Sequence, residues 1–184
     1  MKQKFLLLLI IVFSPLVLIQ SQTENTKHSF VGVDVCATCH KTEKQGMQLD
    51  AWKKSKHSQA YKTLQTEKAN AIAKEKGFET PAAETDACLK CHVSGYNVDA
   101  SLLGEKFKVE DGVQCETCHG AGADYKSLKI MKNREESVAN GLMIHEKLED
   151  FCVNCHNAES PTFVQGDINE MWEKIKHPVP VKSE

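Results

Sequence analysis

The eight cysteines are the residues whose spacing most clearly suggests chemistry. They form four Cys-x-x-Cys pairs, and a histidine directly follows each pair. The cysteines are Cys36, Cys39, Cys88, Cys91, Cys115, Cys118, Cys152 and Cys155, and the histidines are His40, His92, His119 and His156. This is the signature of c-type haem attachment: two thiols on one side of a helical turn bond to the two vinyl groups of a haem, and the next imidazole binds its iron. The sequence therefore predicts four covalently attached haems c.

Three other chemistries also use paired cysteines. Zinc sites are built from such pairs, and the interval between Cys91 and Cys115 is close to that of a zinc ribbon. A disulfide framework and a thioredoxin-like dithiol are the other two. None of the three explains a histidine after every pair, in a chain with only 8 histidines among 184 residues. Haem attachment explains all four.

The histidines outside the motifs are His28, His57, His145 and His177. An iron with two axial imidazoles is saturated and suits electron transfer, whereas an iron with one has an open face for a small ligand. Apolar neighbours at helical spacing favour His57, His145 and His177 as second ligands, while His28 is close to the expected start of the mature chain. The alternatives Met47, Met131, Met143 and Met171 are more typical of a core.

The segments that must position these residues are predicted to be mainly helical. Residues 42–76 are rich in Lys, Gln, Glu and Ala, which predicts one or two helices that end at Gly77. Residues 126–147 are predicted to be helical, with a break near Asn140 and Gly141. Residues 95–112 are predicted to form a loop or a short hairpin.

A short helix is predicted near the C-terminus. Asp167 and Glu170 resemble a capping box, an apolar stripe including Trp172 follows, and His177-Pro178 ends the pattern. We also expect a tight bend at residues 120–122, where two glycines follow the third motif. The fold class is therefore mainly α with long loops and little β, wrapped around cofactors.

The N-terminus predicts export. Lys2 and Lys4 precede an apolar run from Phe5 to Ile19, and Ser21 stands at a possible cleavage point. We expect residues 1–21 to be a signal peptide and residues 22–184 a single tetrahaem domain in the periplasm, without stable membrane insertion after cleavage. The alternative is an uncleaved anchor.

Composition narrows the remaining classes. Charged residues make up 26% of the chain, hydrophobic residues 41%, and the formal net charge is −2. These values argue against a disordered chain, a polytopic membrane protein and a nucleic-acid-binding protein. Aromatic residues are few, so we expect the haems to supply apolar surface and little folded protein to form without them.

The sequence around these motifs resembles the tetrahaem cytochrome c554 family of periplasmic multihaem cytochromes. The resemblance covers almost the whole mature chain. It lies in Trp52-x-x-Ser55-x-His57-x-x-Ala60, Cys88-x-x-Cys91-His92-Val93-x-Gly95-Tyr96, Gly112-Val113-x-Cys115-Glu116-x-Cys118-His119-Gly120-x-Gly122, the fourth motif and a late His177.

The resemblance implies a compact, mostly helical fold with haems in close pairs. It implies that His57 and His177 are distal ligands, that three haems have two axial histidines, and that the iron on His92 is open. This chain departs from the family after the third motif, where Ala121 replaces a proline and Tyr125 stands where relatives carry a histidine. One haem, with the first as the candidate, therefore takes His145, takes Tyr125, or stays open.

Two functions follow as hypotheses. The first is an electron carrier between redox partner proteins, in which the lysine-rich segments 53–62 and 126–132 could attract acidic partners. The second is an enzyme that reduces nitric oxide, hydroxylamine or nitrite at an open haem, with Tyr96, Tyr125 and His145 as the polar residues to test. Because no distinct catalytic set is visible, we expect the carrier.

Overall fold

The computed structural model describes residues 28–179, so the predicted signal peptide lies outside the described residues. The α-helices are α1 (Val33–Ala37), α2 (Gln48–Lys54), α3 (Ala60–Leu64), α4 (Glu67–Glu75), α5 (Asp86–His92), α6 (Cys115–His119), α7 (Leu128–Met131), α8 (Arg134–Ala139), α9 (Leu148–Cys152) and α10 (Ile168–Ile175). Five short 3₁₀ turns lie between them: η1 (Glu43–Gln45), η2 (His57–Gln59), η3 (Ala82–Glu84), η4 (Ala100–Leu102) and η5 (Val109–Asp111). The predicted class, mainly α with long loops, is confirmed.

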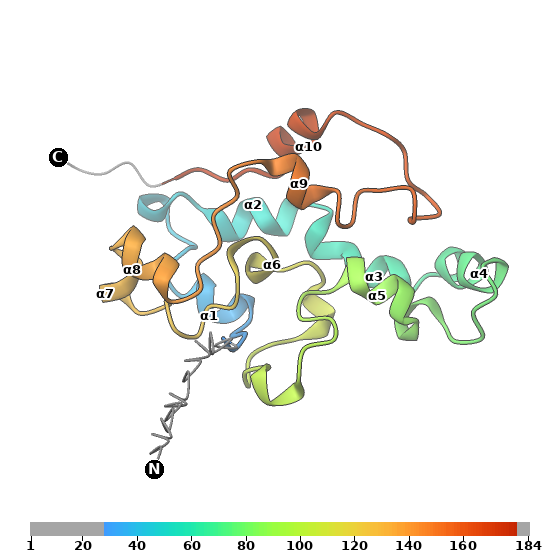
Figure 1. Cartoon of the computed structure of the whole chain (residues 1–184), viewed down its shortest axis with the longest axis horizontal. Coiled ribbons are helices and arrows are strands. Elements are labelled where there is room, and N and C mark those ends of the chain that lie inside the picture. Colours follow the sequence, from blue (N-terminus) through green and yellow to red (C-terminus); the bar gives the residue numbers. More distant parts are fainter. Residues whose placement is uncertain (1–27, 180–184) are drawn as a thin grey trace, which may run out of the picture.

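The helices are spread along the long axis of the molecule. In Figure 1, α7 and α8 lie at one end and α4 at the other, with α6 between α1 and α5. None of the helices in residues 28–179 is long and apolar enough to cross a membrane.

The region predicted as one or two helices, residues 42–76, is divided into η1, α2, η2, α3 and α4. The backbone is extended at Ser55, which follows α2, and at Thr66, which caps α4. Gly77 ends α4 as predicted, with φ of +85°. Its N–H donates to Lys74 and the Phe78 N–H donates to Ala73, the hydrogen-bond pattern of a Schellman C-cap.

Residues 95–112 form a loop that contains η4 and η5, so the hairpin alternative is wrong. The single β-bridge among the described residues joins Phe30 to Leu103 in parallel. This bridge holds the loop against the segment that leads into α1. The ring of Phe107 meets Phe30 edge-on at 5.7 Å between centroids and reinforces the contact.

The two predicted helical regions near the C-terminus form in part. Residues 126–147 contain α7 and α8, and Gly141 with φ of +102° breaks the pattern as expected, but residues 143–147 are not helical. The predicted cap of α10 is confirmed, because the Asp167 carboxylate accepts hydrogen bonds from the N–H groups of Asn169 and Glu170 at 2.7 and 3.3 Å.

The hydrophobic core is small. Within residues 28–179, seven hydrophobic residues are buried: Val31, Val33, Leu64, Ala73, Ala82, Val93 and Tyr125. Leu64, Ala73 and Ala82 form one cluster, against which Cys88 and Leu89 of the second motif pack. A core of this size is too small for a chain this long, which agrees with a fold built around cofactors.

Candidate functional site

Each Cys-x-x-Cys-His motif is part of a helical turn. The second motif lies in α5 and the third in α6. The first and fourth motifs begin in α1 and α9 and continue past the helix end, where the N–H groups of His40 and His156 still donate to the carbonyls of Cys36 and Cys152 at 3.1 and 2.9 Å. All four motifs therefore share the local backbone that two thioether bonds and one axial imidazole require.

The motifs lie against one another in a definite order. The Cys36 thiol of the first motif contacts Cys115 of the third, and this hydrogen bond together with burial raises the pKa of Cys36. Burial and the nearby Cys91 thiol of the second motif raise the pKa of Cys155, in the fourth, to about 12. Burial and the neighbouring Cys152 raise the pKa of Cys118 to about 11. The spatial order of the motifs is thus first, third, fourth, second.

Hydrogen bonds also connect the third motif to the second motif and to the segments α2 and η2. Ser94, just after the second motif, accepts from the Gln114 N–H at 2.7 Å through its Oγ, and its hydroxyl also contacts Thr117 inside the third motif. The Trp52 indole N–H donates to the Val113 carbonyl at 2.8 Å. The Val113 N–H in turn donates to the His57 carbonyl at 3.1 Å. These contacts connect Trp52, His57 and Val113, which all lie in the stretches that carry the family resemblance.

Two motif histidines face a second imidazole. His156 lies opposite His57 with 6.1 Å between ring centroids, and His119 lies opposite His177 with 5.8 Å. Two imidazoles bound to opposite faces of one iron, at about 2 Å per bond, have ring centres about 6 Å apart. Both pairs have about this distance between their ring centres.

Burial favours the neutral form, which is the form that binds iron, in one imidazole of each pair, His57 and His119. Burial is the main cause, and His156 the second, that lowers the pKa of His57. Burial, followed by the nearby His177, lowers the pKa of His119 to about 4.

His92 has a different environment. Its Nδ1 is 2.8 Å from the Ala60 carbonyl, which is its acceptor, so Nε2 points away from that bond. Such a second hydrogen bond fixes the tautomer and orientation of an iron-binding imidazole. No other imidazole is in ring contact with His92 or His40 within residues 28–179.

The remaining predicted ligands contact other groups. The His145 Nε2 is 2.6 Å from the Cys118 carbonyl, and its ring lies against Phe151 at 4.0 Å. His28 is paired with Asp124 at 2.6 Å. The buried Tyr125 hydroxyl donates to the carbonyls of His119 and Gly120 at 3.1 and 2.9 Å. The assignment of His145 as an iron ligand stays a prediction.

The bend after the third motif brings two stretches of backbone into close contact. Gly120 has φ of +77°, and a Cβ at this position would lie 2.3 Å from the Gly141 carbonyl oxygen. Only glycine fits there. The turn after the third motif lies at residues 123–125, so the bend predicted at residues 120–122 is displaced toward the C-terminus. The group that Gly120 approaches is the returning chain after α8.

Sequence reasoning assigned no role to Glu116, although it stands inside the third motif. Its carboxylate is buried and accepts hydrogen bonds from three backbone N–H groups, those of Val31, Gly32 and Gly122. The charged side chain between Cys115 and Cys118 was visible in the sequence, but its backbone partners, which are far away in the chain, were not.

A cavity of about 340 Å³ lies beside His156. Apolar side chains supply most of its lining, including Val153, Phe163, Ile168 and Met171. An apolar cavity next to a motif histidine, together with the two imidazole pairs, shows that the residues present fit haem.

Comparison with known proteins supports this assignment. Residues 35–120 match the family described as cytochrome c554 and c-prime. This part of the chain is similar to the cytochrome c554 family. Cytochrome c-554 of Nitrosomonas europaea is 32% identical over 101 residues, which are 53% of this chain and 40% of that protein. The match thus spans less than half of the relative, and no solved structure matches the chain.

Similarity to the cytochrome c554 family agrees with the fold class and with covalently bound haem c. The matched residues contain the first three motifs, whereas the fourth lies beyond residue 120. The geometry of the fourth motif, with its helical turn and the facing His57, therefore comes from the structure.

Proposed function

We propose that this chain is a tetrahaem c-type cytochrome that transfers electrons between redox partner proteins in the periplasm, to which residues 1–21 direct it as a cleaved signal peptide. The observation that carries the proposal is the pair of imidazole contacts, His57 with His156 and His119 with His177, at the spacing of two axial ligands. A bound haem supplies one-electron chemistry at its iron.

In this proposal His156 and His57 hold the fourth haem, and His119 and His177 hold the third. Saturating both axial positions leaves no site for an exogenous ligand, and it keeps the coordination unchanged when the electron arrives or leaves. Ligation by two imidazoles also lacks the methionine that raises the potential of many c-type haems. We therefore expect low reduction potentials at these two sites.

The contacts between motifs supply a route. Cys36 touches Cys115, Cys118 lies near Cys152 and Cys155, and Cys155 touches Cys91. Thiols in contact bring the attached porphyrin edges close, so electrons can pass in the order first, third, fourth, second motif. The first and second motifs are then the ends at which partner proteins exchange electrons.

The test is the intact mass of the exported protein together with a haem count from its pyridine haemochrome spectrum. We expect the mass of the chain from residue 22 onward plus four haems. A variant with Cys152→Ser and Cys155→Ser should carry three. A polypeptide of bare mass without bound iron would overturn the proposal.

A second function is favoured by one observation, the surroundings of His92. Its Nδ1 is oriented by Ala60 and, among residues 28–179, no imidazole lies across from it, so its haem has an open face. Such a site could reduce nitric oxide, hydroxylamine or nitrite. Electron paramagnetic resonance of the oxidised protein should then show a high-spin haem that shifts on addition of nitric oxide, and an entirely low-spin spectrum would leave only the carrier.

A further inference from the structure

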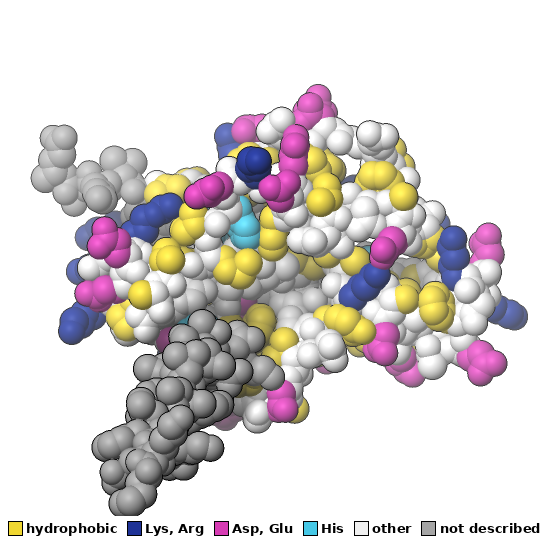
Figure 2. Space-filling model, viewed as in Figure 1, with side chains coloured by type: hydrophobic (Ala, Val, Ile, Leu, Met, Phe, Trp, Pro, Cys, Tyr) yellow, Lys and Arg dark blue, Asp and Glu magenta, His cyan; other side chains and the backbone are white. Residues whose placement is uncertain are grey.

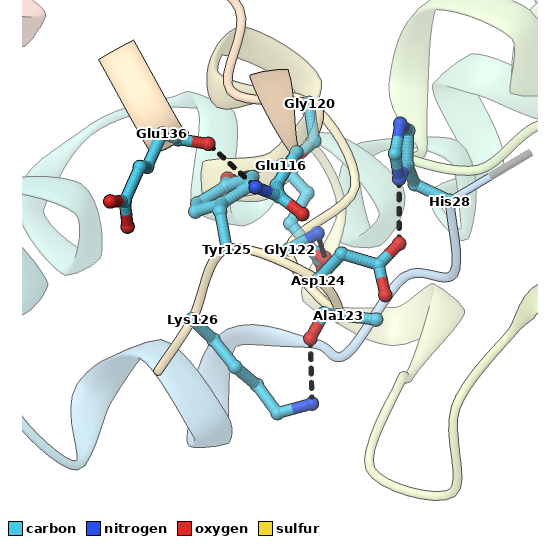
Figure 3. A network of polar contacts seen from close by, with 10 residues as sticks. His28, Glu116, Gly120, Gly122, Ala123, Asp124, Tyr125, Lys126 and Glu136 are labelled. Carbon is cyan, nitrogen blue, oxygen red and sulfur yellow. Dashed lines mark hydrogen bonds and ion pairs between the residues drawn. The ribbon is translucent and has the colours of Figure 1, made fainter. Parts of the chain in front are cut away.

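Glu116 is the most deeply buried acidic residue near the motifs, with 2% of its surface exposed. One carboxylate oxygen accepts from Val31 N–H at 2.8 Å and from Gly122 N–H at 2.7 Å, and the other accepts from Gly32 N–H at 2.8 Å. Figure 3 shows Glu116 beside Gly122. Gly122 belongs to the loop that also carries Asp124 and Tyr125. Every hydrogen-bonding neighbour is a donor, which is the arrangement that a carboxylate anion fills.

No cation of residues 28–179 forms an ion pair with this carboxylate. The ion pairs formed within residues 28–179 involve His28, Lys90, Lys108 and Lys176, and none of them includes Glu116. The negative charge is therefore held by backbone dipoles alone. A charge stabilised in this way still acts on its surroundings, and it does so strongly because little water reaches it.

The charge lies between the first and third motifs. Glu116 follows Cys115 in α6, and the backbone that it binds, Val31 and Gly32, leads directly into α1 and Cys36. The Cys36 thiol touches Cys115. After that contact and burial, the Glu116 charge is a further cause that raises the pKa of the Cys36 thiol, and after burial and Cys36 it has the same effect on Tyr125.

We propose that Glu116 is a potential-setting residue, a fixed internal negative charge that lowers the reduction potentials of the haems on the first and third motifs relative to those on the second and fourth. This inference rests on the proposed function. One-electron reduction converts a ferric haem to a ferrous haem with one positive charge fewer, so a nearby carboxylate stabilises the oxidised form. A unit charge about 10 Å from an iron, at an effective dielectric constant of about 20, changes the redox equilibrium by roughly tenfold.

The consequence is a direction for electron flow. With the third and first haems poised lower than the fourth and second, an electron that enters at the first motif moves downhill toward the second. The carboxylate achieves this without contacting an iron ligand, because its hydrogen bonds go only to backbone N–H groups.

The test measures the haem reduction potentials of the haem-loaded protein by optical redox titration. It compares two pairs of proteins, and the side chains at position 116 in each pair have the same size but differ in charge. Glu116→Gln removes the charge and keeps the length. We expect two of the four haems to become about tenfold more reduced at a given applied potential, a rise of about 59 mV for a one-electron couple. Glu135→Gln, which removes an exposed carboxylate from α8, is the control and should leave all four potentials unchanged.

The second pair consists of Glu116→Asp and Glu116→Asn. Both new side chains are shorter than the native one, and they differ from each other only in charge. It decides the matter if Glu116→Gln does not assemble: the Asn variant should show two higher potentials than the Asp variant. The inference would be overturned if the two proteins of each pair had the same four potentials, or if all four potentials rose together when the charge is removed. Either result would leave the proposed function intact. Absence of haem from the unsubstituted protein would instead overturn the proposed function.

Discussion

Single residues decide how each iron is held, and the distant partner of each motif histidine is the part that sequence reasoning could least specify. The four attachment motifs are local patterns, so their cysteines and proximal histidines can be recognised from a few consecutive residues. The facing imidazole is not local: His57 meets His156, and His177 meets His119, across several intervening helices. Resemblance to a family indicated His57 and His177 as ligands, but the structure was needed to say which motif each one faces.

Replacing His177 by alanine should remove one axial ligand from the third-motif haem. We expect one low-spin signal to be lost and one high-spin signal to appear in the electron paramagnetic resonance spectrum of the oxidised protein, because a single imidazole leaves a weak ligand field. Unchanged low-spin signals in His177→Ala would contradict the pairing with His119.

The same measurement on His145→Ala examines the sequence-based assignment of that residue as an iron ligand. The hydrogen bond of His145 to Cys118 and its contact with Phe151 favour an unchanged spectrum.

Tyr125 stands where relatives carry a histidine, and in this chain its side chain stabilises the loop after the third motif by hydrogen bonds. Its hydroxyl donates to the carbonyls of His119 and Gly120, and the His119 carbonyl also accepts from the Met143 N–H at 3.0 Å. Tyr125→Phe should lower the free energy of unfolding of the haem-loaded protein by about 1–3 kcal/mol, because the Gly120 carbonyl loses the donor that Tyr125 supplies. Chemical denaturation followed by circular dichroism measures the change, and Tyr96→Phe, at an exposed tyrosine, is the matched control. Equal stabilities of the two variants would show that the Tyr125 hydroxyl contributes nothing.

At the level of elements, caps were easier to predict than the lengths of helices. Gly77 and Asp167 end and begin their helices as the sequence indicates, because a cap depends on a few neighbouring residues. Residues 42–76 have helical composition throughout, yet the chain turns at Ser55. The turn lets Trp52 and His57 both reach Val113, a tertiary contact that composition does not reveal. The apolar residues of 95–112 likewise pack as a loop, because their one strand-like partner is Phe30.

The cap of α10 offers a test at this scale. Asp167→Ala removes the acceptor for two helix N–H groups, so the free energy of unfolding should fall by about 1 kcal/mol. Since α10 leads to His177, fraying at its start should leave the third-motif spin state unchanged while the protein remains folded. Thermal unfolding and the low-spin signal are measured together on the same sample. Asn169→Ala, an exposed change in the same helix, should not lower stability, and a comparable loss there would contradict the capping role.

At the scale of the whole molecule, the surface charges do not single out a partner site, whereas the interior packing supports a prediction about the haems. Figure 2 shows Lys and Arg side chains interspersed with Asp and Glu over the end that carries α7 and α8, so the lysines of 126–132 do not stand alone on this face. Attraction of an acidic partner by that segment stays a prediction. The interior, in contrast, has a plain deficit of apolar side chains, which is why the haems are expected to complete it.

That deficit makes the strongest prediction about the molecule as a whole. The seven buried hydrophobic residues of 28–179 include two alanines and cannot offset the conformational entropy of so long a chain. Protein produced without the machinery that attaches haem should therefore show no cooperative unfolding transition, and limited proteolysis should cut it at many sites. The haem-loaded protein should resist the same protease dose, because thioether bonds to the proposed haems would hold the motif helices around apolar groups. A haem-free chain that unfolds cooperatively and resists proteolysis equally well would show that the described side chains form a sufficient core by themselves.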